Sequence, residues 1–164
     1  ILSIGAVKFD LDKGKMEDGG FYTLVSADSN IEIGRHISES TLAWWMGQGD
    51  AAKKVFTDPN VSLTRALEEF IAWVDRDRDD CVVWGNGSDF DVAILAHAFH
   101  THGLTQPWKF WNTRCFRTYK NLPGAPRCTT PPVIAHNALH DAVSQAKHAL
   151  EIHAALFGKK ETKK

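Results

Sequence analysis

The chain has 164 residues, of which 43% are hydrophobic and 24% charged, enough apolar side chains for the core of one globular domain. Lysine plus arginine total 19 and aspartate plus glutamate 20, so the formal net charge of −1 excludes nucleic-acid binding through bulk positive charge. The three cysteines lack CxxC spacing, which disfavours a disulfide framework or a cysteine zinc site and favours a reduced, cytoplasmic protein. No apolar run approaches the roughly 18 to 20 residues that cross a bilayer, so we expect no membrane segment.

The first residues predict a β-hairpin. The opening sequence ILSIGAVKF is rich in Ile and Val and alternates in a way typical of a strand buried on at least one side. Residues 10–20 are polar and glycine-rich, so we expect them to turn the chain into a second strand over residues 21–27.

Two helices should follow the hairpin. The first is predicted over residues 41–56, with Ser40 or Thr41 as its cap. Its apolar face would bury Leu42, Trp45, Met46, Ala52 and Phe56. The second is predicted over residues 62–74, with an inward face made of Leu63, Ala66, Leu67, Phe70 and Val74.

The second half of the chain predicts another strand and two more helices. Residues 75–80 alternate in charge and are expected to form a solvated loop. The continuous apolar run at residues 81–84 is typical of an interior strand, and apolar residues recur at helical spacing over residues 90–99. A last helix is predicted over residues 138–157, and Gly158 should end it.

A hairpin followed by alternating helices and strands favours an α/β layered fold with a mixed sheet. No internal repeat and no long linker divides the chain. We therefore expect one domain over residues 1–157 and a basic, flexible tail over residues 158–164.

His136 and Asp141 are the first candidate pair for chemistry. They are five residues apart, about 500° around an ideal helix, so they cannot share one helical face. They can converge if His136 lies in a loop and Asn137 caps the helix, which puts Asp141 on the second turn. A loop histidine beside a helix carboxylate suits acid–base or metal chemistry, although a solvated surface pair is the plainer interpretation of these two residues alone.

A second candidate cluster follows the predicted interior strand. Gly85, Asn86 and Gly87 break the strand, and Asp89 and Asp91 open the next helix. Ligands of α/β proteins usually bind where strands end, but two acidic residues in the first turn also complement the helix dipole. The residues alone leave both interpretations open.

Histidines and tryptophans offer further candidates. His97, His100 and His102 could suggest zinc, but no cysteine or carboxylate stands at ligand spacing, so a solvated helix end is the better interpretation. Tryptophans can stack nucleobases, and Trp44 points about 100° away from Trp45, nearer to a groove, whereas Trp45 and Trp73 are expected in the core.

Taken together, five motifs resemble a known family. In order they are ILSIGAV, TLAWW with a following Gln48, WGNGSDFDVAIL, PWKFWN with Arg117 after it, and HNALHDA. They resemble the DEDD-type (DEDDh), ribonuclease T-like 3′-5′ exonucleases, in particular the phage and prophage exodeoxyribonuclease VIII-like branch and its mycobacterial exoribonuclease relatives. The resemblance covers nearly the whole of residues 1–157.

The resemblance implies a ribonuclease H-like, three-layer fold with a mixed central sheet flanked by helices. It implies that four carboxylates hold two divalent metal ions, Mg²⁺ or Mn²⁺, and that a histidine activates the attacking water. Asp91 and Asp141 then match the third and fourth carboxylates, and His136 matches the general base. Asn86 lies in the loop that passes near the terminal nucleotide.

The chain departs from this family at one point. The family's first two carboxylates form a DxE motif on a strand that precedes the sequence ILSIGAV, and Asp10 and Asp12 stand at the wrong position to replace them. We expect either that an N-terminal segment with this motif precedes Ile1 in the native protein, or that this chain is inactive unless another chain supplies the strand.

The predicted function is hydrolysis of phosphodiester bonds from the 3′ end of single-stranded DNA or RNA. The alternative is a catalytically inactive relative of the same fold that binds nucleic acid or a protein partner; a zinc-binding module built on the histidines at positions 97, 100 and 102 is a third option. The sequence does not distinguish DNA from RNA, and the resemblance also allows a homodimer.

Overall fold

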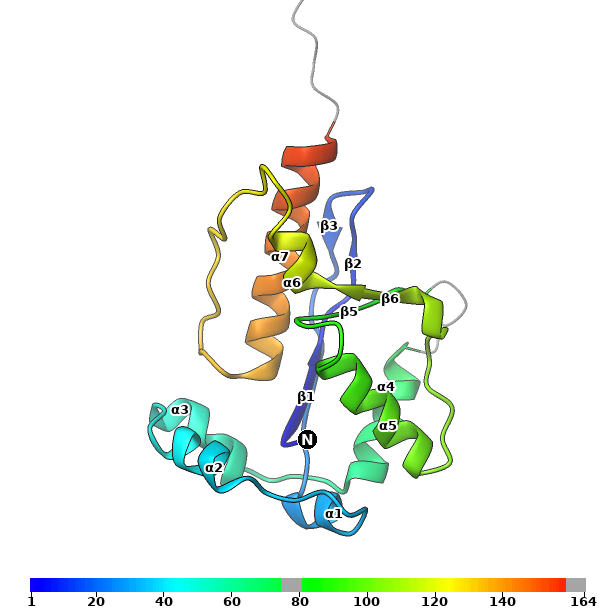
Figure 1. Ribbon diagram of the computed structural model, residues 1–164, viewed down its shortest axis with the longest axis vertical. Helices are drawn as coiled ribbons and strands as arrows, with labels where there is room; N and C mark the ends of the chain where they lie inside the picture. The colour runs from blue at the N-terminus through cyan, green and yellow to red at the C-terminus, as the bar shows by residue number, and fades with distance from the viewer. Residues whose placement is uncertain (75–80, 159–164) are drawn as a thin grey trace, which may run out of the picture.

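The computed structural model describes residues 1–74 and 81–158 and combines short strands with helices, so the predicted α/β class is confirmed (Figure 1). The strands are β1 (Ser3–Ala6), β2 (Phe9–Asp10), β3 (Lys15–Met16), β4 (Phe21–Leu24), β5 (Val83–Gly85) and β6 (Thr113–Cys115). The helices are α1 (Ala27–Ile31), α2 (Glu39–Met46), α3 (Asp50–Lys53), α4 (Leu63–Val74), α5 (Asp91–Thr101), α6 (Phe116–Lys120) and α7 (Ala138–Phe157), with short 3-10 turns η1 (Lys54–Phe56) and η3 (Phe110–Asn112).

The predicted opening hairpin is present. Strands β1 and β4 pair antiparallel, with Ser3 opposite Leu24 and Ala6 opposite Phe21. The polar stretch between them forms a second, smaller hairpin of β2 and β3 rather than a simple turn. At its tip the Lys13 backbone N–H donates to Asp10 Oδ1 at 2.9 Å, which closes the turn.

The predicted mixed sheet is not continuous among the described residues. Strands β5 and β6 pair in parallel, with α5 between them in the chain, and the described strands form three separate two-stranded sheets. Each of β1 and β5 therefore has one unpaired edge among the described residues. A cavity of about 1030 Å³ is lined by residues from both strands.

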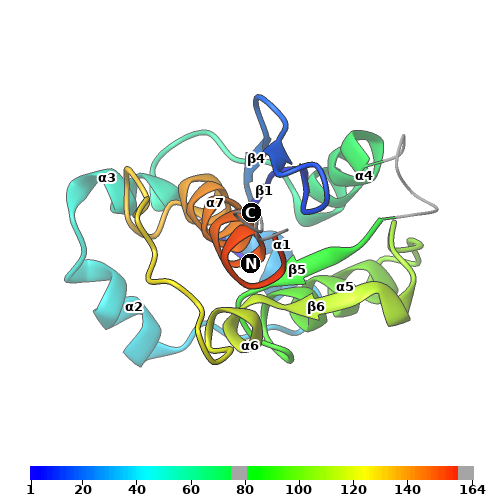
Figure 2. The ribbon, with the colours of Figure 1, turned by 90° about the horizontal axis from the view of Figure 1, so that it is seen from above.

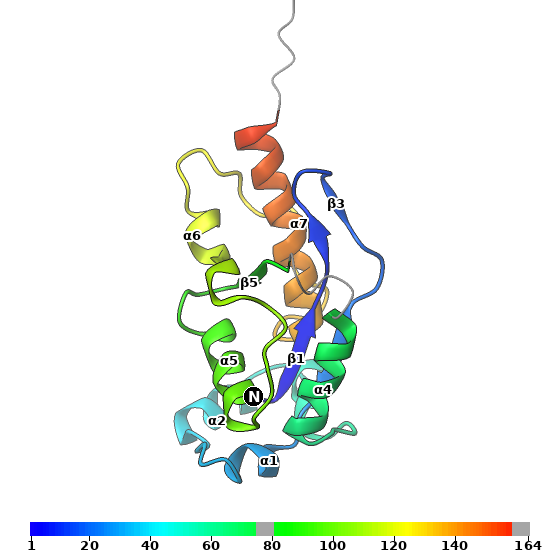
Figure 3. The same ribbon diagram turned by 90° about the vertical axis from the view of Figure 1, so that its right-hand side faces the viewer.

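The core forms around α4, as its apolar spacing predicts. Leu63, Ala66 and Leu67 are completely buried, and Phe70 and Val74 are nearly so. They pack with residues of α5 and with Trp108 into the main apolar cluster. Figure 3 shows β1 beside α4, with α5 and α6 on the other side.

The prediction of one helix over residues 41–56 is wrong in its length and its cap, and of its predicted apolar face only Ala52 is fully buried. It is divided into α2, α3 and η1, because Gly47 ends α2 and Gly49 stands at the start of α3. The Ser38 Oγ accepts from the Thr41 N–H at 3.4 Å, so Ser38 is the cap in place of the two predicted residues. Helix α2 has no buried residue, and Leu42, Met46 and Phe56 are exposed.

Helix α7 begins and ends where the sequence predicts, between Asn137 and Gly158. It runs through the middle of the molecule, with α2 and α3 on one side and α4 on the other (Figure 2). Side chains of α7 hold the proline-rich loop that precedes it. The Ser144 hydroxyl donates to the Thr130 carbonyl at 2.7 Å, and His148 Nε2 donates to the Pro126 carbonyl at 2.9 Å.

The loop predicted over residues 75–80 and the tail from residue 159 lie outside the described residues. Within the described ranges, no helix is both long and apolar enough to pass through a membrane. The three cysteines, all of them in the described part of the chain, form no disulfide.

Candidate active site

The structure brings His136 and Asp141 together at the start of α7. His136 lies in the loop just before the helix, as predicted, and Asp141 lies in the first turn of α7, where the spacing predicted the second. The backbone of His136 is left-handed, with φ of 64°, and among the described residues other than glycine it alone has a positive φ. Such strained conformations are concentrated at functional sites, so the backbone itself marks this position.

The surroundings of the Asp141 carboxyl group shift its pKa in opposite directions. Burial raises the pKa of Asp141 above its usual value and is the largest effect. The charge of His136 and the backbone N–H of His136 act in the opposite direction, followed by the charge of His140. Asp141 is thus half-buried and lies close to His136, the residue with which the sequence analysis pairs it.

The start of α7 is fixed to the first hairpin by a close backbone approach. The Asn137 side chain caps the helix and accepts from the N–H groups of Leu139 and His140, both at 3.1 Å. A Cβ added to Gly5 of β1 would lie 2.2 Å from the Ala138 carbonyl carbon, so only glycine fits. Gly5 therefore sets the distance between β1 and the helix that carries Asp141.

Asp91 is positioned from the other half of the molecule, at the carboxyl end of β5. The backbone N–H of Asn86 donates to Asp91 Oδ2 at 2.9 Å. A Cβ on Gly85 would lie 2.9 Å from Val92 Cγ2 and 3.4 Å from the Asp91 Cβ, so the strand end and the helix start are in tight contact. Asp89 lies in the exposed turn before α5, where it accepts from the Ser88 hydroxyl at 3.4 Å.

Asn86 and Arg117 supply polar groups beside Asp91. Within the described part of the chain, Asn86 Oδ1 is buried and has no hydrogen-bond partner. The Arg117 guanidinium comes from α6 and would lie 3.8 Å from a Cβ on Gly87 of the same loop. The sequence analysis assigned no role to Arg117. Its position after the PWKFWN motif is the sequence feature that could have identified it.

Aromatic rings form a wall on the other side of His136. The ring centroids of Trp44 and His136 are 4.8 Å apart, and those of Trp45 and His136 are 6.3 Å apart. Trp45 also packs edge-on against Phe56, at 5.6 Å. Trp45 is half-buried in this wall, outside the main core, which corrects the expectation of a core tryptophan, whereas Trp73 does pack against the core.

The residues present fit divalent-metal binding only in part. Asp91 and Asp141 offer the hard carboxylate oxygens that Mg²⁺ and Mn²⁺ prefer. Nevertheless, no three His, Cys, Asp or Glu side chains of the described residues gather into a group that could hold a metal ion. Two carboxylates do not complete the coordination of a hard cation, so further oxygen ligands are needed.

The zinc interpretation of the histidine cluster has no support in the structure. His97 Nδ1 lies 3.3 Å from the Arg35 guanidinium, and His102 Nδ1 donates to the Ala98 carbonyl at 2.8 Å. His97 and His100 are exposed at the end of α5, in keeping with a solvated helix end.

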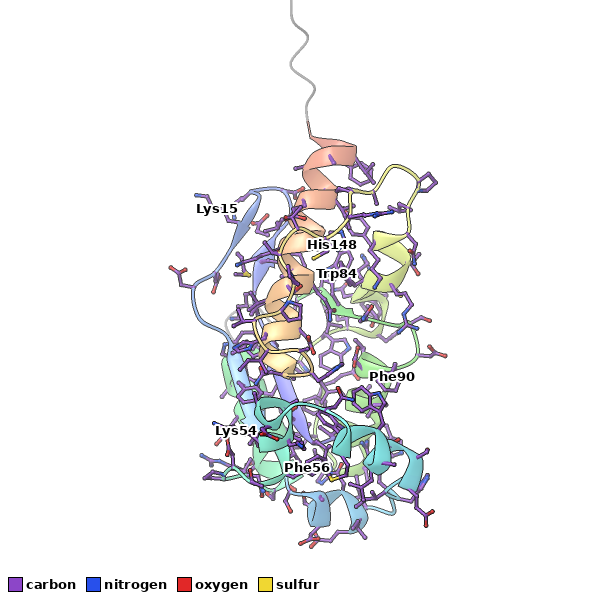
Figure 4. The ribbon with its side chains drawn as sticks, turned by 90° about the vertical axis from the view of Figure 1, so that its left-hand side faces the viewer. Lys15, Lys54, Phe56, Trp84, Phe90 and His148 are labelled. Atoms are coloured by element: carbon purple, nitrogen blue, oxygen red, sulfur yellow. The ribbon has the colours of Figure 1, made fainter. Side chains whose placement is uncertain are left out.

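The cavity between the two unpaired strands is lined by neighbours of the site residues on β1, β5 and α7. Its lining includes Gly5 of β1, Trp84 of β5 and Ala142, which follows Asp141 on α7. Figure 4 shows Trp84 in the middle of the molecule, between α7 and the α5–α6 side.

Comparison with known proteins gives one family match. The family of the 3′-5′ exoribonuclease Rv2179c-like domain matches residues 1–153. Searches of curated proteins and of solved structures gave no match.

Proposed function

Because the chain belongs to the 3′-5′ exoribonuclease Rv2179c-like domain family, we propose that it removes nucleotides from the 3′ end of single-stranded nucleic acid. The observation that carries the proposal is the meeting of His136 and Asp141 at the start of α7, beside exposed aromatic rings. The family's name favours RNA as the substrate, and DNA stays an alternative that the experiment below compares directly.

His136 serves as the general base in this proposal. Its imidazole is exposed, so it can take a proton from a water molecule that attacks the terminal phosphodiester. The left-handed backbone and the cap at Asn137 fix the direction in which the imidazole leaves the chain. His140 has a structural role instead, because its Nδ1 accepts from the Ile134 N–H at 3.2 Å.

Asp91 and Asp141 would hold two divalent cations, Mg²⁺ or Mn²⁺, which supply stabilisation of the attacking and leaving oxygens when bound. The missing ligands would come from an extended strand in the cavity between β1 and β5. A strand there would pair with both free edges and complete the ribonuclease H-like mixed sheet. The resemblance to DEDDh exonucleases puts the first two carboxylates on such a strand.

Asn86 and Arg117 would bind the end of the substrate. The partnerless Asn86 Oδ1 can accept from a terminal ribose hydroxyl, which would satisfy a buried acceptor. The Arg117 guanidinium, beside the Gly87 loop, suits a phosphate oxygen. Because the net charge is only −1, this local positive group matters more than the overall charge.

The test is incubation of the chain with 5′-labelled single-stranded RNA and DNA of one sequence, with Mn²⁺ or with EDTA, followed by sizing on a gel. We expect a metal-dependent ladder of products shortened from the 3′ end. His136→Ala and Asp141→Asn should lower the rate by orders of magnitude, and His140→Ala is the matched control on the same helix. Near-normal cleavage by either site variant would refute the assigned roles.

The second candidate function is an inactive relative that binds nucleic acid or a protein partner. The observation that favours it is that the described residues contain no group of three His, Cys, Asp or Glu side chains that could hold a metal ion. Nucleic-acid binding with no shortening under any metal condition would favour this candidate. The cytoplasmic location and the homodimer stay predictions.

A further inference from the structure

The positive charge of the chain is unevenly distributed along the sequence. Residues 92–140 contain no aspartate or glutamate, although the whole chain has 20. The lysines and arginines of this segment are Lys109, Arg114, Arg117, Lys120 and Arg127. All are exposed except Lys120, which is half-buried. A chain with a net charge of −1 therefore contains a locally basic segment, to which an anionic ligand can bind.

The cations of this segment are not neutralised by the fold. In other parts of the chain, Lys13 pairs with Asp10 at 2.9 Å and Arg65 pairs with Glu69 at 2.7 Å. Among the described residues, no lysine or arginine of the segment 92–140 forms an ion pair of this kind. Their charge is therefore available to a ligand that approaches from solvent.

Helix α6 brings two of these cations together. Arg117 and Lys120 are three residues apart on this helix, so they are neighbours on its surface. Lys120 Nζ lies 5.6 Å from the centroid of the buried Phe116 ring, which holds the ammonium group against the helix.

The proline-rich loop brings a third cation to the same side of α7. The His148 ring of α7 lies 5.6 Å from the Phe116 ring of α6, and His148 Nε2 donates to the Pro126 carbonyl at 2.9 Å. Arg127 follows Pro126 directly and is exposed. Figure 3 shows α6 beside α7, with this loop leading away from its end. We call Arg117, Lys120 and Arg127 the α6 surface.

Two carboxylates lie close to the ends of the α6 surface. Glu151 is half-buried and its Oε1 accepts from the hydroxyl of Thr129, in the proline-rich loop. Asp89 is exposed and accepts from the Ser88 hydroxyl, beside Gly87. Neither forms an ion pair with a cation of the α6 surface among the described residues, so the surface stays positive.

One end of the α6 surface meets the candidate site. The Arg117 guanidinium would lie 3.8 Å from a Cβ on Gly87, in the loop where the Asn86 N–H donates to Asp91. If the terminal nucleotide lies at this loop, the rest of the strand leads away from it on the 5′ side. A polyanion that starts at the site and continues over these cations is the backbone of a single-stranded nucleic acid. This step rests on the function proposed above.

We propose that Lys120 and Arg127 bind backbone phosphates of a single-stranded nucleic acid on the 5′ side of its terminal nucleotide. The α6 surface recognises no base sequence, because phosphate contacts position a strand without distinguishing its bases. The surface favours longer strands, since only these have phosphates that reach both Lys120 and Arg127.

The test measures binding without catalysis, by fluorescence anisotropy of a 5′-labelled single strand of about ten nucleotides in EDTA. Each phosphate contact adds about 0.7 to the steepness with which log affinity falls against log salt concentration. The double variant Lys120→Gln with Arg127→Gln should therefore reduce this slope by about 1.4. Between about 50 and 200 mM salt, the wild type should then lose about 7-fold more affinity than the variant.

The matched control is Lys13→Gln with Arg65→Gln, which removes the same charge from two cations that already pair with carboxylates. It should keep the salt dependence of the wild type. Equal changes of slope in the two double variants would show that only the overall charge matters, and would overturn the proposal.

Two further measurements exclude misfolding and other polyanions. The exchange Lys120→Arg with Arg127→Lys retains both charges and should retain the slope, and loss of the slope in this variant would overturn the proposal. A poly-glutamate peptide of equal charge should not displace the oligonucleotide at matched concentration. Equal displacement would assign the α6 surface to an acidic protein instead.

The two proposals fail in distinguishable ways. A reduced slope in the Lys120 and Arg127 double variant, without cleavage by the wild type under any metal condition, would support the α6 surface and reject the exonuclease. Metal-dependent cleavage of the long strand with an unchanged KM in this variant would reject the α6 surface and support the exonuclease.

Discussion

Helices α4 and α2 lie in segments that were both predicted to bury an apolar face, and they have opposite positions in the structure. The inward residues of α4 are buried in the core, whereas α2 buries none and presents its tryptophans to His136. Spacing shows which side chains share a face, and it does not show what covers that face. An apolar helix can therefore pack against a candidate site residue as well as into a core.

The largest expected effect is a difference in protein stability between core substitutions in α4 and surface substitutions in α2. Leu67→Ala in α4 empties a fully buried position and should lower the free energy of unfolding by about 2 to 5 kcal/mol. Leu42→Ala in α2, at 42% exposure, should cost about 0.5 kcal/mol or less. Urea unfolding measures both. Equal costs would show that the face of α2 is covered in solution and would break the comparison.

Gly5→Ala should have the next largest effect, because its Cβ would collide with the backbone at the start of α7. We expect a loss of about 1 to 3 kcal/mol in unfolding free energy, as for other overpacked sites. Gly49→Ala is the control on the α2–α3 side, where a Cβ would meet no atom within 4 Å. If both variants unfold at the same urea concentration, α7 is not held by Gly5.

The N-cap of α7, Asn137, should contribute more to protein stability than the N-cap of α2, Ser38. Asn137→Ala removes an acceptor for two N–H groups of α7 and should cost about 1 kcal/mol. Ser38→Ala removes one 3.4 Å contact at the start of the peripheral α2 and should cost less. Thermal unfolding of the two variants compares them. A larger loss for Ser38→Ala would mean that α2 contributes more to the folded state than its exposure indicates.

The left-handed backbone of His136 predicts a smaller difference between two substitutions. Glycine adopts φ of 64° without strain and alanine does not, so His136→Gly should be more stable than His136→Ala by about 0.5 to 1 kcal/mol. Both should lack nuclease activity equally. Chemical unfolding of the pair checks the strain, and greater stability of the alanine variant would contradict it.

The smallest effect should appear in the pH dependence of stability at Asp141. Burial raises the pKa of Asp141 above 3.8 in the folded state, so the folded protein binds this proton more tightly than the unfolded chain does. As pH rises from 3.8 through the raised pKa, the wild type loses stability relative to Asp141→Asn, and the difference is then constant. Urea unfolding in EDTA across this window measures it. A relative gain for the wild type with rising pH would reverse the sign.

Much of the helical structure could be predicted from the sequence, because caps and buried faces leave local signals. The burial of Leu67, the cap at Asn137 and the loop position of His136 are all confirmed. Helix geometry allowed His136 and Asp141 to converge, and the family resemblance selected them as a pair.

Other features depend on contacts that no local pattern encodes. The exposure of α2 depends on what packs against that segment, and a cavity lies between β1 and β5, which do not pair. The approach of Arg117 to the Gly87 loop joins residues 30 positions apart in the chain, and the N–H of Asn86 on Asp91 depends on a sharp turn.

The hydrogen bonds from Ser144 and His148 attach the proline-rich loop to α7. His136 is the end of that loop, and the loop is fastened to the same helix that carries Asp141. In the proposed function, the His136 imidazole and the Asp141 carboxylate would therefore move together when α7 shifts. An opening that admits a nucleic-acid end would then come from the opposite side, where α2 is held by aromatic edges and has no buried residue.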